Sequence, residues 1–121
     1  IALAENEQNL LRRRSLLEDL SLRNAYFYLG ACAFDLGRYE EAIRHYDAAR
    51  ERYPGDPTTL VAMTQVVSAH LRMGDRRRAA TANERARRFF ESLPAEVWDD
   101  PSLPMGRADW ERWLEAGAVL S

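Results

Sequence analysis

The chain has 121 residues, of which 46% are hydrophobic and 30% are charged, so it is long and apolar enough to fold and is unlike a disordered segment. Its formal net charge of −2 excludes a strong overall attraction to nucleic acid or to an anionic membrane. No apolar run approaches the roughly 20 residues that a membrane-spanning helix needs.

Apolar residues recur with helical spacing along nearly the whole chain, which predicts an all-α fold. Gly37 and Gly74 each end a predicted helix, because glycine adopts the left-handed C-terminal conformation without steric cost. Asp56 is a predicted N-cap, and Pro57 stands at the first helical position, where its missing N–H costs nothing. The expected helices cover residues 3–19, 23–36, 39–53, 57–73, 75–91 and 107–118.

The two central helix pairs form an internal repeat. Gly37 and Gly74 lie 37 residues apart, and small residues recur at the same offset around them. The matched pairs are Ala42 with Ala79 and Ala49 with Ala86. A fixed period of this size is typical of stacked helical hairpins, in which each pair covers an apolar face of the next. Small residues at matched places allow the helix axes to approach closely.

The first of these repeats resembles the tetratricopeptide (TPR) motif. The residues that carry the resemblance are Tyr26, Phe27, Tyr28, Leu29, Gly30, Ala33, Phe34, Gly37, Tyr39, Ala42, Ile43, Tyr46, Ala49 and Pro54. The second repeat is degenerate: Gly74, Ala79 and Ala86 match, but Asn83 stands where the motif usually has an aromatic residue. The resemblance implies a right-handed superhelix of antiparallel helix pairs.

On this basis the whole chain, residues 1–121, is one TPR-like domain. Two repeats lie between an N-terminal helix and a C-terminal capping helix whose tryptophans cover an apolar end. The expected segments are an N-terminal helix (1–20), a first repeat (23–56), a degenerate second repeat (57–93), a Pro- and Asp-rich connector (94–104) and a capping helix (105–121).

The sequence offers no pattern for catalysis or for binding a metal or a cofactor. His45 and His70 are the only histidines, and neither has a second His or a Cys at metal-ligand spacing. No Ser, His and Asp set stands in a recognised nucleophile context, and no glycine-rich loop for phosphate is present. We therefore expect a scaffold for protein–protein interaction rather than an enzyme.

The TPR resemblance implies where a peptide or a helix of a partner would bind. In that family the first helix of each pair lines a concave groove. The corresponding residues are Asn24, Phe27, Tyr28, Ala31, Asp35, Thr64, Gln65, Ser68 and Arg72. Phe27 and Tyr28 are the expected anchors, since aromatic side chains dominate binding hot spots. The alternative is that the preceding helix covers both as core.

An alternative function rests on the Arg-rich segment 72–88, which has seven Arg against Asp75 and Glu84. This excess could bind nucleic acid or an acidic partner. The simpler interpretation is a solvated helix surface, or a basic helix against which the acidic C-terminal end folds back. Nucleic acid is accordingly the less favoured partner.

Two expectations concern origin. All 17 basic residues are Arg, which favours a GC-rich bacterial genome, and the start at Ile1 rather than Met favours a fragment of a longer protein. The junction from Tyr53 to Pro57 resembles those of bacterial cell-envelope TPR proteins, which favours the periplasm or envelope over the cytoplasm. The sequence does not decide the oligomeric state.

Overall fold

A computed structural model of the chain describes residues 2–99, 103 and 105–118, and for residues 2–6, 16, 17, 19–21 and 118 it describes the backbone alone. The elements are α1 (Ala2–Asp35), α2 (Tyr39–Arg52), α3 (Thr58–Arg72), α4 (Arg76–Ser92), the short 3-10 helix η1 (Ala95–Asp99) and α5 (Arg107–Ala118). These described residues contain no strand, which confirms the all-α prediction. Parts of the predicted connector (100–102 and 104) and of the predicted cap (119–121) lie outside them.

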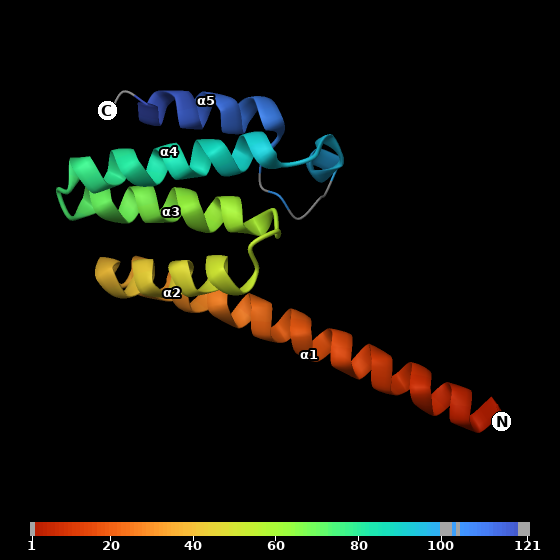
Figure 1. The fold of residues 1–121 in the computed structure, drawn as a ribbon. Coiled ribbons are helices and arrows are strands. Elements are labelled where there is room, and N and C mark those ends of the chain that lie inside the picture. The colour runs from red at the N-terminus through yellow and green to blue at the C-terminus, as the bar shows by residue number, and fades with distance from the viewer. Residues whose placement is uncertain (1, 100–102, 104, 119–121) are drawn as a thin grey trace.

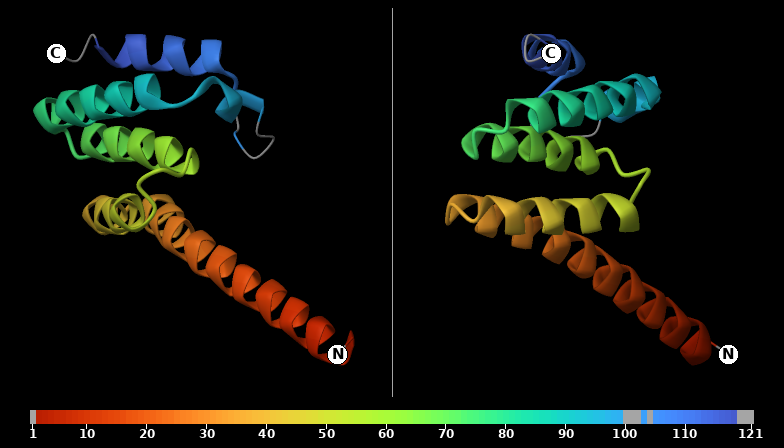
Figure 2. Two further views of the ribbon diagram at one scale, coloured as in Figure 1. Left: turned by 45° about the vertical axis from the view of Figure 1, so that its right-hand side comes forward. Right: turned by 60° about the vertical axis from the view of Figure 1, so that its left-hand side comes forward.

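The helices stack in chain order. α1 packs against α2 and α3 packs against α4, and these two pairs meet through α2 and α3. α5 closes the far side by packing on α4, and the first half of α1 extends away from the stack (Figure 1). The views in Figure 2 show the same order from two other sides. The arrangement confirms the predicted fold of repeated helical hairpins, which are followed by α5.

One prediction about α1 was wrong. We expected separate helices over 3–19 and 23–36, but a single helix of 34 residues runs from Ala2 to Asp35. The chain from Ala2 to Leu29 contains neither glycine nor proline, the residues that most often end helices. Ser21 alone does not interrupt the backbone hydrogen bonds, so the N-terminal segment continues straight into the first repeat.

The two turns inside the hairpins are built alike. Gly37 and Gly74 have φ values of 76° and 77°, the left-handed conformation that the sequence predicts. After each glycine the next N–H donates back across the helix end, from Arg38 to the Ala33 carbonyl and from Asp75 to the His70 carbonyl, both at 2.9 Å. This is the Schellman arrangement, which satisfies carbonyls that the helix end would leave free. The repeat is therefore preserved in hydrogen bonding as well as in sequence.

The loop between α2 and α3 is fixed by Asp56. One oxygen of its carboxylate accepts from the Thr58 N–H at 2.9 Å, which confirms the predicted N-cap role. The other oxygen accepts from the Arg23 guanidinium at 2.7 Å, and both side chains are largely buried. This ion pair ties α1 to the loop that leads into α3, and so sets the position of the second repeat on the first.

The core divides into two clusters. One lies between α1, α2 and α3 and contains Ala33, Ala42, Tyr46, Ala62 and Val66. The other lies between α3, α4 and α5 and contains Leu60, Met63, Ala86, Phe90, Trp110 and Leu114. The four alanines that recur in the repeat are completely buried, as close helix packing requires. Both clusters include residues of α3, which makes it the central helix of the fold.

The departure at Asn83 from the TPR motif is explained by α5. Asn83 is buried, and its side-chain amide donates to the Leu114 carbonyl of α5 at 3.1 Å. The capping helix comes so close at this point that a Cβ on Gly117 would overlap the Asn83 amide. A polar side chain here thus anchors the cap.

We expect Asn83→Ala to lower the free energy of unfolding by about 1–2 kcal/mol, because it removes a buried hydrogen bond between α4 and α5. Asn24→Ala is the matched control, since Asn24 is exposed on α1, and it should change stability by less than about 0.5 kcal/mol. Urea unfolding followed by circular dichroism measures both values. Equal effects of the two substitutions would contradict the anchoring role of Asn83.

Candidate partner-binding surfaces

The residues predicted to bind a partner come from α1 and α3, and we call them together the α1–α3 face. The two helices contact each other only slightly, so the two sets of residues flank a seam between the repeats. Asn24, Tyr28, Asp35 and Arg72 are exposed, whereas Phe27, Ala31, Gln65 and Ser68 are partly buried and Thr64 is buried.

Phe27 and Tyr28 have different surroundings. Tyr28 is 69% exposed, whereas Phe27 packs against the core cluster of Ala33, Tyr46 and their neighbours. The pKa of the Tyr28 hydroxyl is raised by the Cys32 side chain one turn further along α1. No described residue of the N-terminal segment lies over Tyr28, because that segment is the same straight helix. Tyr28 is therefore the aromatic side chain of the α1–α3 face that a partner could reach.

Thr64 offers little to a ligand. Its hydroxyl donates to the Val61 carbonyl of the preceding helical turn at 2.8 Å, and the residue is only 7% exposed. On α3 the accessible part of the face therefore consists of Gln65, Ser68 and Arg72.

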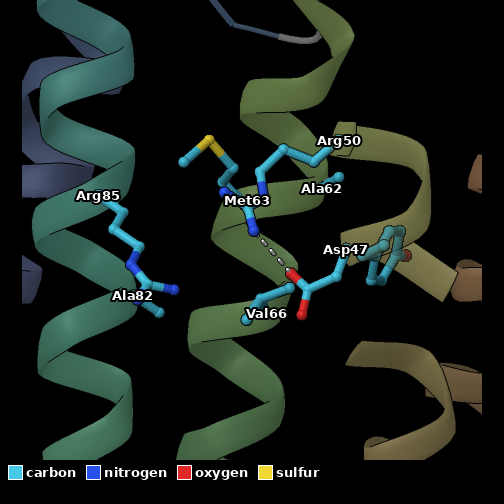
Figure 3. Close-up of a pocket in the computed structure, with 8 residues that line it drawn as sticks. Asp47, Arg50, Ala62, Met63, Val66, Ala82 and Arg85 are labelled. Atoms are coloured by element: carbon cyan, nitrogen blue, oxygen red, sulfur yellow. Dashed lines mark ion pairs between the residues drawn. The ribbon is translucent and has the colours of Figure 1, made fainter. Parts of the chain in front are cut away.

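A second surface lies on nearly the opposite side of α3. A small, shallow depression opens between α2, α3 and α4 (Figure 3). Ala62, Met63, Val66 and Ala82 form its apolar lining, with Tyr46 beside them. Asp47 and Arg50 stand at its edge, paired at 3.6 Å, and Arg85 approaches from α4. The buried position of Tyr46 raises its pKa to about 12, so its hydroxyl is neutral at physiological pH.

The amino-acid sequence does not reveal this depression, because its lining comes from three helices. Ala62 and Ala82 create the space, and each alone looks like an ordinary helix-packing alanine. The small residue Ala82 was the signal available on α4, but a single residue of α4 gives no information about the position of α2. Only the packing of α2 and α4 on the same side of α3 brings the residues together.

The Arg-rich segment 72–88 is partly neutralised on its own helix. Arg78 pairs with Asp75 at 3.4 Å, and Arg87 and Arg88 both approach Glu84 at 3.6 Å. α5 brings further acids beside α4, since Glu111 and Glu115 line an open cleft together with Arg87 and Glu91. Charges of both signs thus alternate along this side of the molecule.

Neither histidine belongs to a cluster of ligating side chains. His70, near the end of α3, is partly buried, and this burial lowers its pKa. Within residues 2–99, 103 and 105–118, no group of three His, Cys, Asp or Glu side chains gathers as a metal site would require. In the same part of the chain, no helix combines the length and apolar character needed to cross a membrane.

Comparison with known proteins supports the repeat assignment independently of the structure. A family model described as Tetratricopeptide repeat matches residues 21–92, more than half of the chain. The matched region begins within α1 and ends with α4, so it covers both hairpins and leaves out α5. Neither the comparison with curated proteins nor that with solved structures found a match.

Proposed function

The chain belongs to the tetratricopeptide repeat family, and from this premise we propose that it binds a peptide or a helix of a partner protein on the α1–α3 face. Repeats of this family generally mediate protein–protein interaction and are not catalysts. The observation that carries the proposal is the exposure of Tyr28, a large aromatic side chain held on a rigid helix beside the partly buried Phe27. An aromatic anchor with few rotamers binds with little loss of conformational entropy.

The polar residues of the face suggest what the partner presents. Asp35 and Arg72 occupy equivalent places in the two repeats, 37 residues apart, and both are exposed near the ends of their helices. Gln65 and Ser68 supply neutral hydrogen-bonding groups one to two turns before Arg72 on α3. This arrangement is complementary to a partner segment with one apolar side chain that contacts Tyr28. The same segment would place polar or oppositely charged groups near Asp35 and Arg72.

We expect Tyr28→Ala to weaken partner binding by about 30-fold, the effect of removing a typical hot-spot residue. Phe27 is left intact in this experiment because it packs in the core, so its removal would disturb the fold as well as the surface. Partners captured by the wild-type chain are first identified by quantitative mass spectrometry, and each affinity is then measured by calorimetry with the purified partner.

The control for this experiment is Leu10→Ala, which removes an exposed apolar side chain from the distant half of α1. It should leave the affinity unchanged. If Tyr28→Ala folds normally and retains every partner with wild-type affinity, the α1–α3 face is not the binding site. Loss of binding in both variants would equally count against it, because the effect would not be local.

The alternative partner, a nucleic acid or an acidic protein bound along segment 72–88, has weaker support. Arg78, Arg87 and Arg88 already pair with acids of α4, and counterion release from such paired groups is small. Gel retardation of a labelled duplex at low salt tests this alternative directly.

A further inference from the structure

His70 lies near the junction of the two repeats. It stands in the last turn of α3, the central helix, which packs against both α2 and α4. Its carbonyl accepts from the Asp75 N–H at 2.9 Å, in the turn that leads into α4. The residue 37 positions earlier is Ala33, which is 6% exposed in the core cluster of the first repeat. The second repeat thus has a titratable ring at the place that alanine fills in the first.

The imidazole of His70 is partly removed from water. The residue as a whole is partly exposed, but its Nδ1 atom is buried, and none of the described residues forms a hydrogen bond with that atom. In a neutral imidazole one ring nitrogen is a donor and the other is an acceptor, whereas in a protonated imidazole both are donors. The protonated ring therefore carries a charge and also needs an acceptor at Nδ1, where the described residues provide none.

Three charged side chains from the neighbouring elements act on the ring. They are Asp47 of α2, Asp75 immediately before α4, and Arg78 in the first turn of α4. Both acids are already engaged with arginines. The Asp47 carboxylate lies 3.6 Å from the Arg50 guanidinium. The Asp75 carboxylate accepts from the Arg78 N–H at 3.0 Å and lies 3.4 Å from the Arg78 guanidinium. The attraction of these acids for a protonated imidazole is therefore partly offset.

The two helix ends near His70 act in opposite directions. The partial negative charge at the C-terminal end of α3 favours a cation, and the partial positive charge at the N-terminal end of α4 disfavours one. In addition, the carbonyls of Ala69, His70 and Leu71 already accept backbone N–H groups of the turn between these helices. Burial of the ring thus outweighs the nearby acids, and it lowers the pKa of His70.

We propose that His70 is an acid-sensitive switch at the junction of the repeats, where protonation of its imidazole weakens the packing of α3 against α2 and α4. The protonated ring regains full hydration and an acceptor for Nδ1 only if it moves away from the junction. Such a movement disturbs α3, the helix that contributes residues to both core clusters. Acid is therefore expected to act on the contact between the repeats.

The direction of the pH dependence follows from the linkage between protonation and folding. Folding lowers the pKa of His70 below the value of about 6.5 that an imidazole has in an unfolded chain. The unfolded chain therefore binds a proton more readily than the folded protein does. The contribution of His70 to stability is complete above about pH 6.5 and is lost as the pH falls from there through the folded pKa.

The test is urea unfolding of the purified chain at about pH 7.5 and about pH 5, followed by circular dichroism. We expect acidification to lower the equilibrium constant for folding several-fold more in the wild type than in His70→Gln, whose side chain stays neutral. The upper limit is about 30-fold, the ratio of protonated to neutral imidazole in an unfolded chain at pH 5. The carboxylates are the same in both proteins, so their titration cancels in this comparison.

His45→Gln is the matched control. His45 is the other histidine of the chain and lies on α2, and its replacement should leave the acid-induced loss as large as in the wild type. Nuclear magnetic resonance measures the ring directly, and in the folded wild type His70 should titrate below about pH 6.5.

Three results would each overturn the proposal. The first is a His70 ring that titrates at or above about pH 6.5 in the folded protein. The second is an equal acid-induced loss of stability in the wild type and His70→Gln. The third is a His45→Gln variant that lacks the loss. None of these results depends on partner binding at the α1–α3 face, because each is measured with the purified chain alone.

Discussion

Trp110→Ala is expected to lower the free energy of unfolding by about 3–5 kcal/mol, the largest effect of any single substitution considered for this protein. Trp110 is 2% exposed and packs in one cluster with residues of α3 and α4, so its loss leaves a cavity at the junction of three helices. Partial collapse cannot refill the volume of an indole in a packed interior.

Urea unfolding followed by far-ultraviolet circular dichroism measures this loss without depending on tryptophan fluorescence. Trp113→Ala is the control on the same helix: Trp113 is only partly buried, at the margin of the cluster, and its replacement should cost clearly less. If Trp110→Ala lowers the free energy of unfolding by less than about 1 kcal/mol, α5 does not contribute to the stability of the folded core.

Tyr46→Ala is expected to cost about 3 kcal/mol, because this ring fills the core between α1, α2 and α3. The same ring makes Gly30 necessary. A Cβ at Gly30 would lie 2.7 Å from two ring carbons of Tyr46, closer than packed atoms tolerate. Gly30→Ala should therefore destabilise the protein by about 1–3 kcal/mol, even though alanine favours a helix.

The two substitutions should not be additive. In the Tyr46→Ala background the methyl group that Gly30→Ala adds no longer meets the tyrosine ring. The substitution should then be neutral, or stabilise the protein by about 0.5–1 kcal/mol through the higher helix propensity of alanine. A double-mutant cycle by urea unfolding gives the coupling directly. If the two destabilisations simply add, Tyr46 does not pack on Gly30. Tyr28→Ala is the control at an exposed tyrosine, and it should change the free energy of unfolding by less than about 0.5 kcal/mol.

The local chemistry of a few residues was enough to predict most helix boundaries. Gly37 and Gly74 adopt the expected left-handed conformation, and Asp56 caps α3 through the Thr58 N–H. These features depend on the backbone preferences of single residues and their immediate neighbours. The error in α1 was of the same local kind: two helices were expected over 3–19 and 23–36, although no glycine or proline stands between them to end the first.

The site could be predicted only in part. Family resemblance led to the residues of the α1–α3 face, but not to the difference between Phe27, which packs in the core, and the neighbouring Tyr28, which is exposed. Successive residues of a helix point about 100° apart, and which direction is buried depends on helices that come later in the chain. The depression lined by Ala62 and Ala82 escaped prediction for the same reason.

The sequence alone determined the period of 37 residues, the turn glycines and the matched alanines. A repeat is visible as matching residues at a fixed spacing, and a helix end depends on the backbone preferences of a few neighbouring residues. The packing of the helices was needed to show that Asn83 anchors the cap and that Leu22 and Leu29 stay uncovered while their equivalents in α3 are buried. Burial depends on which segments pack together. Leu29 and Val66 occupy equivalent places in two similar helices, and within the described residues Val66 packs against α2 whereas Leu29 is 48% exposed.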